Sequence, residues 1–162
     1  MGNLTLSNNQ NRADNQQGRL NPWWIVGFVD GEGCFSISIL RNVTTKMGVQ
    51  VFPEFVVTQG AKSLSVLEDL QQFFDCGKIY VNRRTDNHKE NLYRYCVRSI
   101  SDIQNKIIPF FNDHRLQTAK YQDFQIFCEV IELINQRSHL NNLGIEKIKA
   151  LIMSMNRRKI RI

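Results

Sequence analysis

The spacing of apolar side chains changes along the chain, and each change predicts a new element. The first apolar stretch predicts a helix over residues 22–31, with Asn21 as its N-cap and Pro22 at the first helical position, where a missing N–H costs no hydrogen bond. From residue 34 the period falls to two, which predicts a strand over 34–40 with one buried face. Its apolar side chains are Phe35, Ile37 and Ile39.

Strand-like and helical spacings then alternate to the end of the chain. The later predicted elements are a strand over 49–59, a helix from about 64 that Cys76-Gly77 closes, strands over 77–84 and 92–98, and helices near 101–112, 118–135 and 143–155. A polar turn, Thr85 to Glu90, joins the second pair of strands. Pro109 should kink or end the first of the last three helices, because proline has no N–H.

The order of these elements is αββαββ followed by helices. It predicts an α/β (α+β) fold in which two hairpins form one antiparallel sheet. The length of 162 residues suits one domain with a proper core, which we assign to residues 21–156. Residues 1–20 are rich in Asn, Gln and Arg with few apolar side chains, so we expect a disordered leader. Residues 157–162 form a basic tail.

An excess of positive charge favours a polyanionic partner. The formal net charge is +6 and the isoelectric point is near 9.3, although charge alone does not separate DNA from RNA or from a membrane surface. Residues 76–98 hold six basic side chains against two acids, a local charge of +4, and the tail adds four basic side chains. No apolar run approaches the roughly 20 residues that span a bilayer, which argues against a membrane protein.

Four cysteines are scattered along the chain, without a Cys-x-x-Cys pair or a nearby His at zinc-ligand spacing. A chain of this size with a full complement of aliphatic and aromatic residues does not need disulfides. We therefore expect buried or half-buried free thiols in a reducing compartment. These residues are Cys34, Cys76, Cys96 and Cys128.

Candidate chemistry lies where the first predicted helix ends. Gly27 and Gly31 are four residues apart, so they share one helix face without Cβ atoms, and another helix backbone can approach closely there. Glu32 follows at the tip of the helix. If the partner helix comes from an identical copy, two carboxylates meet at helix ends that carry partial negative charge. Such a pair is a site for a hard divalent cation.

Residues 25–33, with the sequence IVGFVDGEG, resemble the signature motif of the LAGLIDADG homing endonucleases. Asn21-Pro22-Trp23 before the motif, the predicted strand over 34–40 and the stretch from His139 to Asn156 also resemble this family. The resemblance covers about residues 21–156. It implies the family fold, αββαββ with C-terminal helices and a saddle-shaped antiparallel sheet that binds DNA.

The resemblance also implies an active site shared by two subunits, since chains with one motif act as homodimers. Glu32 matches the catalytic acid and would bind Mg²⁺, for which Mn²⁺ or Ca²⁺ can substitute, while Asp30 matches the earlier Asp and would orient the turn or help hold the metal. Gln59 resembles a Gln that orders water and Lys120 a Lys that stabilises the phosphate, although both could also be ordinary surface residues. The predicted dimer interface is Trp24, Gly27, Phe28 and Gly31.

The far face of the predicted sheet is the expected DNA-reading surface. In each strand one set of side chains covers the core, so the other set projects together. Its polar and basic members suit base edges in the major groove, and its apolar members suit thymine methyl groups. An ordinary solvated face would be as polar but rarely carries this basic excess. The predicted DNA-binding set is Ser36, Ser38, Leu40, Asn42, Gln50, Phe52, Glu54, Val56, Thr58, Lys78, Tyr80, Asn82, Arg84, Arg94, Cys96 and Arg98.

The function implied is that of an intron-encoded, Mg²⁺-dependent endonuclease for double-stranded DNA. It would cut a long, nearly palindromic site across the minor groove by hydrolysis, leaving short 3′ overhangs without a covalent enzyme intermediate. One alternative is a maturase that binds its own intron RNA. Another is a catalytically inactive DNA-binding protein, against which the intact Glu32 argues. From the family we expect an organelle, with a mitochondrion favoured over a chloroplast, and synthesis inside it.

Overall fold

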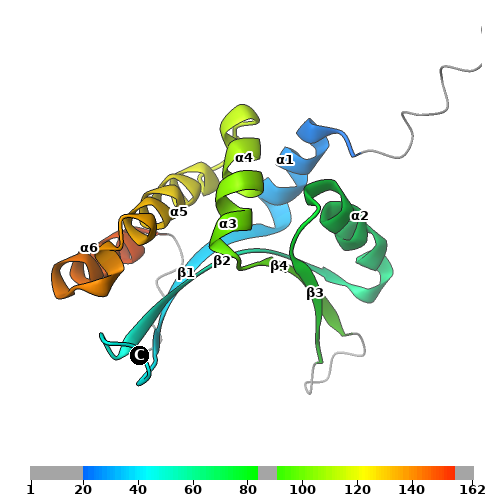
Figure 1. Ribbon diagram of the computed structural model, residues 1–162. Coiled ribbons are helices and arrows are strands. Elements are labelled where there is room, and N and C mark those ends of the chain that lie inside the picture. Colours follow the sequence, from blue (N-terminus) through cyan, green and yellow to red (C-terminus); the bar gives the residue numbers. More distant parts are fainter. Residues whose placement is uncertain (1–19, 84–90, 156–162) are drawn as a thin grey trace, which may run out of the picture.

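Antiparallel strands form one arched sheet in the order β1-β2-β4-β3 (Figure 1). The computed structural model of the protein describes residues 20–83 and 91–155. Its strands are β1 (Gly33–Arg41), β2 (Val49–Gly60), β3 (Lys78–Asn82) and β4 (Leu92–Val97). They confirm the predicted pair of hairpins in a single antiparallel sheet, and no strand end differs from its predicted position by more than two residues.

Helices cover one face of this sheet and leave the other face open. In Figure 1 the labelled helices lie on the convex side of the arch, and the concave side carries none of them. The concave face is therefore the surface that a large ligand can reach. The helical elements are α1 (Pro22–Glu32), η1 (Ala61–Ser63), α2 (Leu64–Phe74), α3 (Ile100–Asp102), η2 (Ile103–Ile107), α4 (Ile108–Asp113), α5 (Lys120–Asn135), η3 (Ser138–Leu140) and α6 (Asn142–Ser154).

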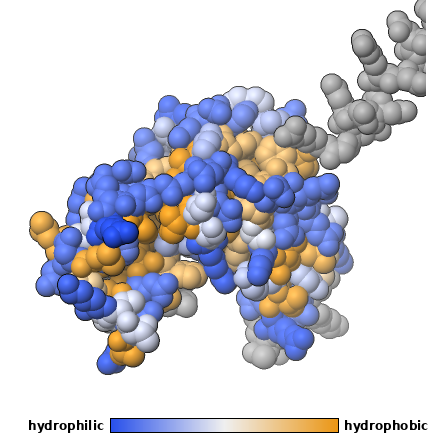
Figure 2. Space-filling model, in the orientation of Figure 1, coloured by the Kyte–Doolittle hydropathy of each residue, from blue (hydrophilic) through white to orange (hydrophobic). Residues whose placement is uncertain are grey.

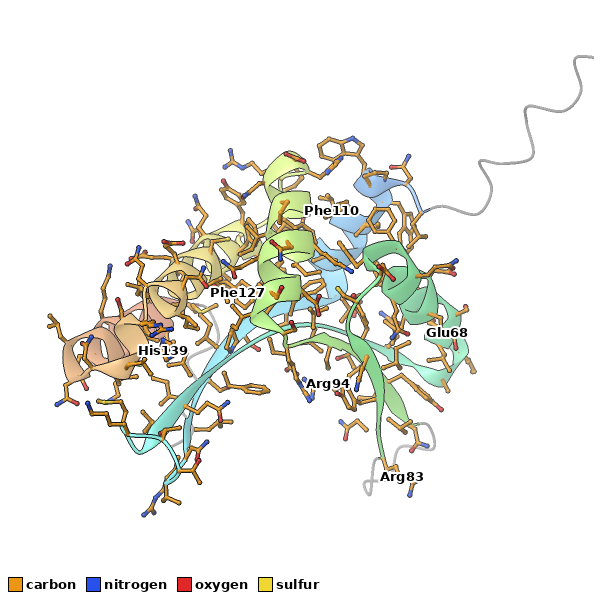
Figure 3. The ribbon with its side chains drawn as sticks, in the orientation of Figure 1. Glu68, Arg83, Arg94, Phe110, Phe127 and His139 are labelled. Carbon is orange, nitrogen blue, oxygen red and sulfur yellow. The ribbon has the colours of Figure 1, made fainter. Side chains whose placement is uncertain are left out.

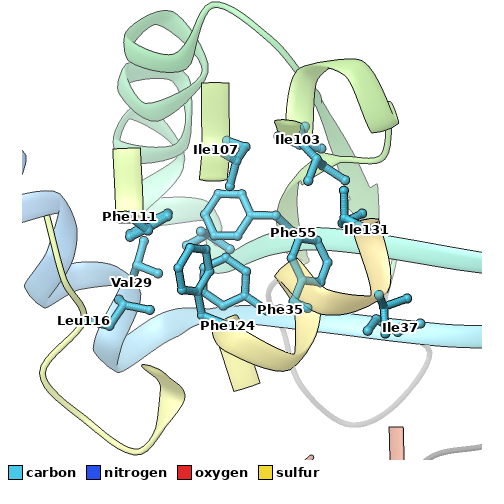
Figure 4. Packing of buried hydrophobic residues seen from close by; sticks show 14 of the residues in the cluster. Val29, Phe35, Ile37, Phe55, Ile103, Ile107, Phe111, Leu116, Phe124 and Ile131 are labelled. Carbon is cyan, nitrogen blue, oxygen red and sulfur yellow. The ribbon is translucent and has the colours of Figure 1, made fainter. Parts of the chain in front are cut away.

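Aromatic side chains fill the space between the sheet and the helices (Figure 4). Phe35 of β1 stacks on Phe55 of β2, with ring centroids 5.1 Å apart. Phe111 and Phe124 meet the ring of Phe35 edge-on, at 5.4 and 5.1 Å. All four rings are buried, and edge-to-face contacts add to their hydrophobic stabilisation. The strands that form the open face are thus held from behind by a close-packed core.

The strand register aligns the predicted open-face positions across the sheet. Ser36 lies opposite Glu54, Thr58 lies opposite Arg94, and Arg94 also pairs with Tyr80 on the other side. Because side chains alternate between the two faces, these residues share the concave face with every second neighbour along their strands. The period-two pattern in the sequence therefore separated the two faces correctly.

Pro109, which was expected to kink or end its helix, does not end it. The chain stays helical from Ile100 to Asp113, but the π-helical turn η2 comes directly before α4. A turn of this kind changes which carbonyl each N–H reaches, so it can accommodate a residue that has no N–H. Pro109 then occupies the first turn of α4, where its missing N–H is not needed.

Several sequence-based expectations concern other parts of the chain. Of the four cysteines, Cys96 is buried and the other three are half-buried, as expected. Within the described ranges no helix has the length and apolar character needed to cross a lipid bilayer. The leader before Leu20, the turn over 85–90, Arg84 and the basic tail over 157–162 lie outside the described residues.

Candidate active site and nucleic-acid interface

A groove of about 880 Å³ follows the concave face of the sheet. Figure 2 shows the molecule hollowed between two lower limbs, where Figure 1 places the concave side of the arch. The lining of the groove includes the three predicted catalytic residues, Glu32, Gln59 and Lys120, as well as Arg94 and Arg98 of the predicted DNA-binding set. The structure therefore brings the candidate chemistry and the candidate DNA-reading surface into one space.

Glu32 is the last residue of α1, and its place depends on Gly33. The chain passes from α1 into β1 without a loop, and the Gly33 N–H donates to the carbonyl oxygen of Val29. A Cβ on Gly33 would lie 2.6 Å from Val29 Cγ1 and 2.8 Å from Val29 O, so only glycine permits this close approach. This corner leaves the Glu32 side chain exposed in the groove lining, at the carbonyl end of the helix.

The carboxylate of Asp30 holds the chain that leads into α5. It accepts hydrogen bonds from the backbone N–H of Gln117 at 2.7 Å and from the N–H and hydroxyl of Thr118 at 3.3 and 2.8 Å. The Thr118 hydroxyl oxygen accepts a further bond from the N–H of Lys120 at 3.2 Å. Of the two roles considered for Asp30, these contacts support the orienting one, because the carboxylate already has donors from the protein.

The ammonium group of Lys120 lies against the end of α1. Its Nζ donates to the carbonyl oxygens of Val29 at 2.7 Å and of Asp30 at 2.9 Å. The C-terminal end of a helix carries partial negative charge, and the ammonium group of Lys120 offsets it. Asp30, whose carbonyl oxygen it binds, lies two residues before Glu32. The predicted contact of Lys120 with a phosphate, and that of Gln59 with water, stay predictions.

Asp123 is a further acid in the groove that was not among the predicted site residues. It lies in the first turn of α5 and shares the groove lining with Lys120. Side chains three residues apart occupy the same face of a helix. A helical prediction that placed Lys120 in the site could therefore have added Asp123.

Glu54 is buried among arginines on the concave face, on which Figure 3 labels Arg94. Its Oε2 accepts a hydrogen bond from Arg94 Nη2 at 2.9 Å, and its Oε1 accepts one from Arg98 Nε at 2.7 Å. The guanidinium of Arg98 also lies over the rings of Tyr80 and Phe52, 4.7 and 5.5 Å from their centroids. Glu54 was expected to meet a base, but in this structure both of its carboxylate oxygens are bonded to arginines.

Two apolar positions of the predicted DNA-binding set have little exposed surface. Val56 is 7% exposed and still lines the groove, whereas Cys96 is 2% exposed. Burial, followed by the nearby charge of Glu54, raises the pKa of the Cys96 thiol to about 11. Their contacts with thymine methyl groups stay predictions.

The other described members of the predicted DNA-binding set have exposed or half-exposed side chains. Asn42 directly follows β1, and its amide donates to the Oε1 of Gln50 at 3.1 Å, which links the two arms of the first hairpin. Their contacts with DNA stay predictions too. The remaining members are Ser36, Ser38, Leu40, Phe52, Thr58, Lys78, Tyr80 and Asn82.

The predicted interface residues form one stripe along α1. Trp24 and Phe28 stack with ring centroids 4.9 Å apart, and Trp24 is 44% exposed. A Cβ built on Gly27 or Gly31 would meet nothing within 4 Å among the described residues. The opposite side of the helix is buried in the core through Ile25, Val26 and Val29. The stripe is therefore an outward surface of aromatic rings and bare backbone.

Known proteins with this fold include DNA-cutting enzymes. The solved structure of I-TnaI, described as a homing endonuclease, is 38% identical, with a TM-score of 0.78 over 87% of this chain and 91% of that chain. I-SmaMI, described as bound to an uncleaved DNA target in the presence of calcium ions, is 37% identical, with a TM-score of 0.77 over 85% of this chain and 45% of that chain.

Curated relatives carry related names. The Neurospora crassa protein called probable intron-encoded endonuclease 3 is 34% identical over 139 residues, which are 85% of this chain and 25% of that protein. DNA endonuclease I-CeuI of Chlamydomonas moewusii is 29% identical over 122 residues, 72% of this chain and 53% of that protein. The chain thus spans from a quarter to about half of the length of these two relatives. The family model for LAGLIDADG endonucleases matches residues 25–131, from the motif helix into α5. The chain belongs to the LAGLIDADG endonuclease family.

Proposed function

We propose that the protein is a site-specific double-strand DNA endonuclease of the homing type, which hydrolyses phosphodiester bonds. The observation that carries this proposal is the shared groove, in which Glu32, Gln59 and Lys120 lie with the arginines of the concave face. Arginines alone would suit binding, because they match phosphates and base edges. An exposed acid at a helix end adds the capacity for metal-assisted hydrolysis. I-SmaMI, a relative, is described as bound to uncleaved and to cleaved DNA.

The active enzyme would be a homodimer joined through α1. The stripe of Trp24, Gly27, Phe28 and Gly31 supports this, since small residues four apart let two helix backbones approach closely. The aligned chain covers only 45% of I-SmaMI, which leaves room in that protein for a second unit of similar size. Two identical halves would bind a nearly palindromic site.

Glu32 from each subunit would hold a divalent cation, for which we propose Mg²⁺. The donors fit, because an exposed carboxylate and helix-end carbonyl oxygens are the hard ligands that such ions prefer. A bound ion would supply charge for activating water and for stabilising the phosphate and the leaving oxygen. Calcium is the ion named for I-SmaMI, so Mn²⁺ and Ca²⁺ belong in any test.

The other groove residues would place and neutralise the reacting groups. Gln59, the last residue but one of β2, would orient the attacking water through its side-chain amide. Lys120 would offset phosphate charge close to the end of α1. Asp30 would keep Lys120 in place through Thr118. Cuts across the minor groove would leave short 3′ overhangs.

An intron within an organellar genome would encode the protein. Its relatives include a Podospora anserina protein from ND4 intron 1 and a Schizosaccharomyces pombe protein named probable intron-encoded endonuclease Cox1-I1b. These names favour a mitochondrion as the site of synthesis and action. The target would be an allele that lacks the intron.

Cleavage of a DNA library that spans candidate target sites tests this function. We expect cut products with 3′ overhangs in Mg²⁺ and none in EDTA. Glu32→Gln should lower the cleavage rate by about 100-fold or more while DNA binding persists, because the amide binds the ion poorly. Glu68→Gln, which changes an exposed acid on α2, is the matched control. If no sequence is cut at high enzyme concentration, the protein is not a nuclease, and cutting by Glu32→Gln would refute the assignment of the acid.

A further inference from the structure

Glu54, Arg94 and Arg98 form a charge cluster on the concave face, and we infer that Glu54 positions Arg98 to read a guanine in each half of the DNA target. This inference rests on the proposed function, because it concerns how the same groove selects its DNA. It gives Glu54 a different role from the base contact that its position in the sequence suggested. Glu54 lies in β2 and Arg94 in β4, two strands that pair directly, and Arg98 is the residue that follows β4.

The Glu54 carboxylate faces the arginines and has little exposure to solvent. Its side chain is 10% exposed, against 35% for Arg94 and 38% for Arg98. To accept a hydrogen bond from a cytosine amino group, Glu54 would have to give up charge-assisted bonds of 2.9 and 2.7 Å. Breaking these bonds is costly, since the carboxylate of Glu54 has little access to water in place of its partners. A positioning role for Glu54 keeps both bonds.

Arg98 is held so that one edge of its guanidinium can meet a base. Its Nε donates to Glu54, which leaves the edge formed by Nη1 and Nη2 with parallel N–H groups. Two parallel donors match the O6 and N7 acceptors of guanine in the major groove. A lysine could not make this two-point contact, because its ammonium is a single point charge.

Two aromatic rings set the plane of the same guanidinium. Arg98 lies over Tyr80 of β3 at 4.7 Å and over Phe52 of β2 at 5.5 Å from the ring centroids. Cation–π contacts of this kind restrain a side chain that otherwise samples many rotamers. An arginine restrained before binding loses less freedom when it meets DNA, so more of its interaction energy appears as discrimination between bases.

The whole cluster also keeps a positive charge. Two arginines outweigh one glutamate, so the pairing does not cancel the attraction of the groove for phosphates. Arg94 shares the carboxylate and lies opposite Thr58 and Tyr80 in the sheet. It helps fix Glu54 by donating to Oε2, the carboxylate oxygen that Arg98 does not bind.

Binding to a panel of DNA targets tests the inference. The panel contains the site identified by cleavage and each of its single base-pair variants, measured in Ca²⁺ without Mg²⁺. We expect Arg98→Ala to lose about tenfold or more of the discrimination at one G·C pair in each half-site. Glu54→Gln should lose discrimination at the same pair. The double variant should lose no more than Arg98→Ala alone, because Glu54 acts through Arg98.

Two further variants keep the test decisive. Glu68→Gln removes the same charge from the exposed surface of α2 and should leave the binding profile unchanged (Figure 3). Arg98→Lys keeps the charge of Arg98 and leaves the buried Glu54 carboxylate with its bond from Arg94, so it remains informative if Glu54→Gln fails to fold. It should retain overall affinity and lose the preference for guanine.

Several results would overturn the inference while leaving the proposed function intact. An unchanged profile for Glu54→Gln would exclude a positioning role. A change at a different base pair from the one that Arg98→Ala affects would mean that Glu54 contacts a base itself. Uniform weakening by Arg98→Ala across all targets would assign Arg98 to a phosphate. If the wild-type protein neither binds nor cuts any site, the proposed function itself fails.

Discussion

Lys120 donates a hydrogen bond from its ammonium group to the backbone carbonyl oxygen of Asp30, at 2.9 Å. The carboxylate of the same Asp30 accepts bonds from the chain just before Lys120, including one from the Thr118 hydroxyl at 2.8 Å. Contacts in both directions therefore join two segments about 90 residues apart in sequence. Because Glu32 lies two residues beyond Asp30, the placement of the candidate catalytic acid depends on this junction.

Replacing Asp30 by alanine should loosen the junction. We expect the free energy of unfolding to fall by about 1–2 kcal/mol, since three accepted hydrogen bonds are lost from a partly exposed site. DNA cleavage should fall further than DNA binding, because Lys120 loses its support. Urea denaturation and single-turnover cleavage measure the two effects. Asp69→Ala, at an exposed position of α2, is the matched control, and equal losses in both variants would contradict the role of Asp30.

Replacing Lys120 by methionine separates a chemical role from a structural one. Loss of the cation at the end of α1 should cost under about 1 kcal/mol of stability. If Lys120 also stabilises the phosphate, cleavage should fall by about 100-fold with little change in DNA affinity. Lys147→Met removes an exposed cation on α6 and should change neither quantity. A cleavage rate close to that of the wild-type protein would limit Lys120 to holding the helix end.

Adding one methyl group to Gly27 should have opposite effects on the monomer and on the dimer. Gly27→Ala should stabilise the single chain by about 0.5–1 kcal/mol, because alanine favours a helix and its Cβ meets nothing nearby. The same group should obstruct a second copy of α1. Analytical ultracentrifugation over a range of concentrations would then show weaker self-association. Unchanged dimerisation would mean that two copies do not meet at Gly27.

Gly33→Ala gives the contrasting case inside one subunit. Its Cβ would lie 2.6 Å from Val29 Cγ1 and 2.8 Å from Val29 O. We expect a loss of about 1–3 kcal/mol in the free energy of unfolding from this overpacking. Thermal or urea unfolding at a fixed protein concentration measures it. Stability equal to that of the wild-type protein would show that the corner between α1 and β1 can open without cost.

The thiol of Cys96 should react slowly with alkylating reagents. Burial, and then the charge of Glu54, raises its pKa to about 11, so at pH 8 only about one thiol in a thousand is ionised. Reactivity should increase as the pH rises toward 11, because the thiolate is the nucleophile. Glu54→Gln should speed the reaction by removing one cause of the raised pKa. Mass spectrometry of alkylated peptides measures the rate, and a rate as fast as in unfolded protein would contradict this burial.

Local patterns in the sequence were enough to predict the elements and the two faces of the sheet. Strand periodicity depends only on neighbouring residues, so the alternation around Phe35 already assigned the core side. The partners of Glu54 lie 40 and 44 residues away, and only the register of β2 on β4 brings them together. The contacts of Asp30 with α5 depend on tertiary packing in the same way. Residue types show that such pairs of side chains are possible, but they do not determine which of the possible pairs form.

The loopless corner at Gly33 couples the motif helix to the first strand of the concave face as one stiff unit. In a dimer joined through α1, no flexible linker would separate the subunit contact from the surface that reads DNA. The distance between the two DNA-reading surfaces would then be fixed by the protein, and with it the spacing of the two half-sites in the target. Inserting a single base pair between the half-sites would move one half-site along and around the duplex. The second subunit, held at a fixed distance from the first, would then no longer reach it.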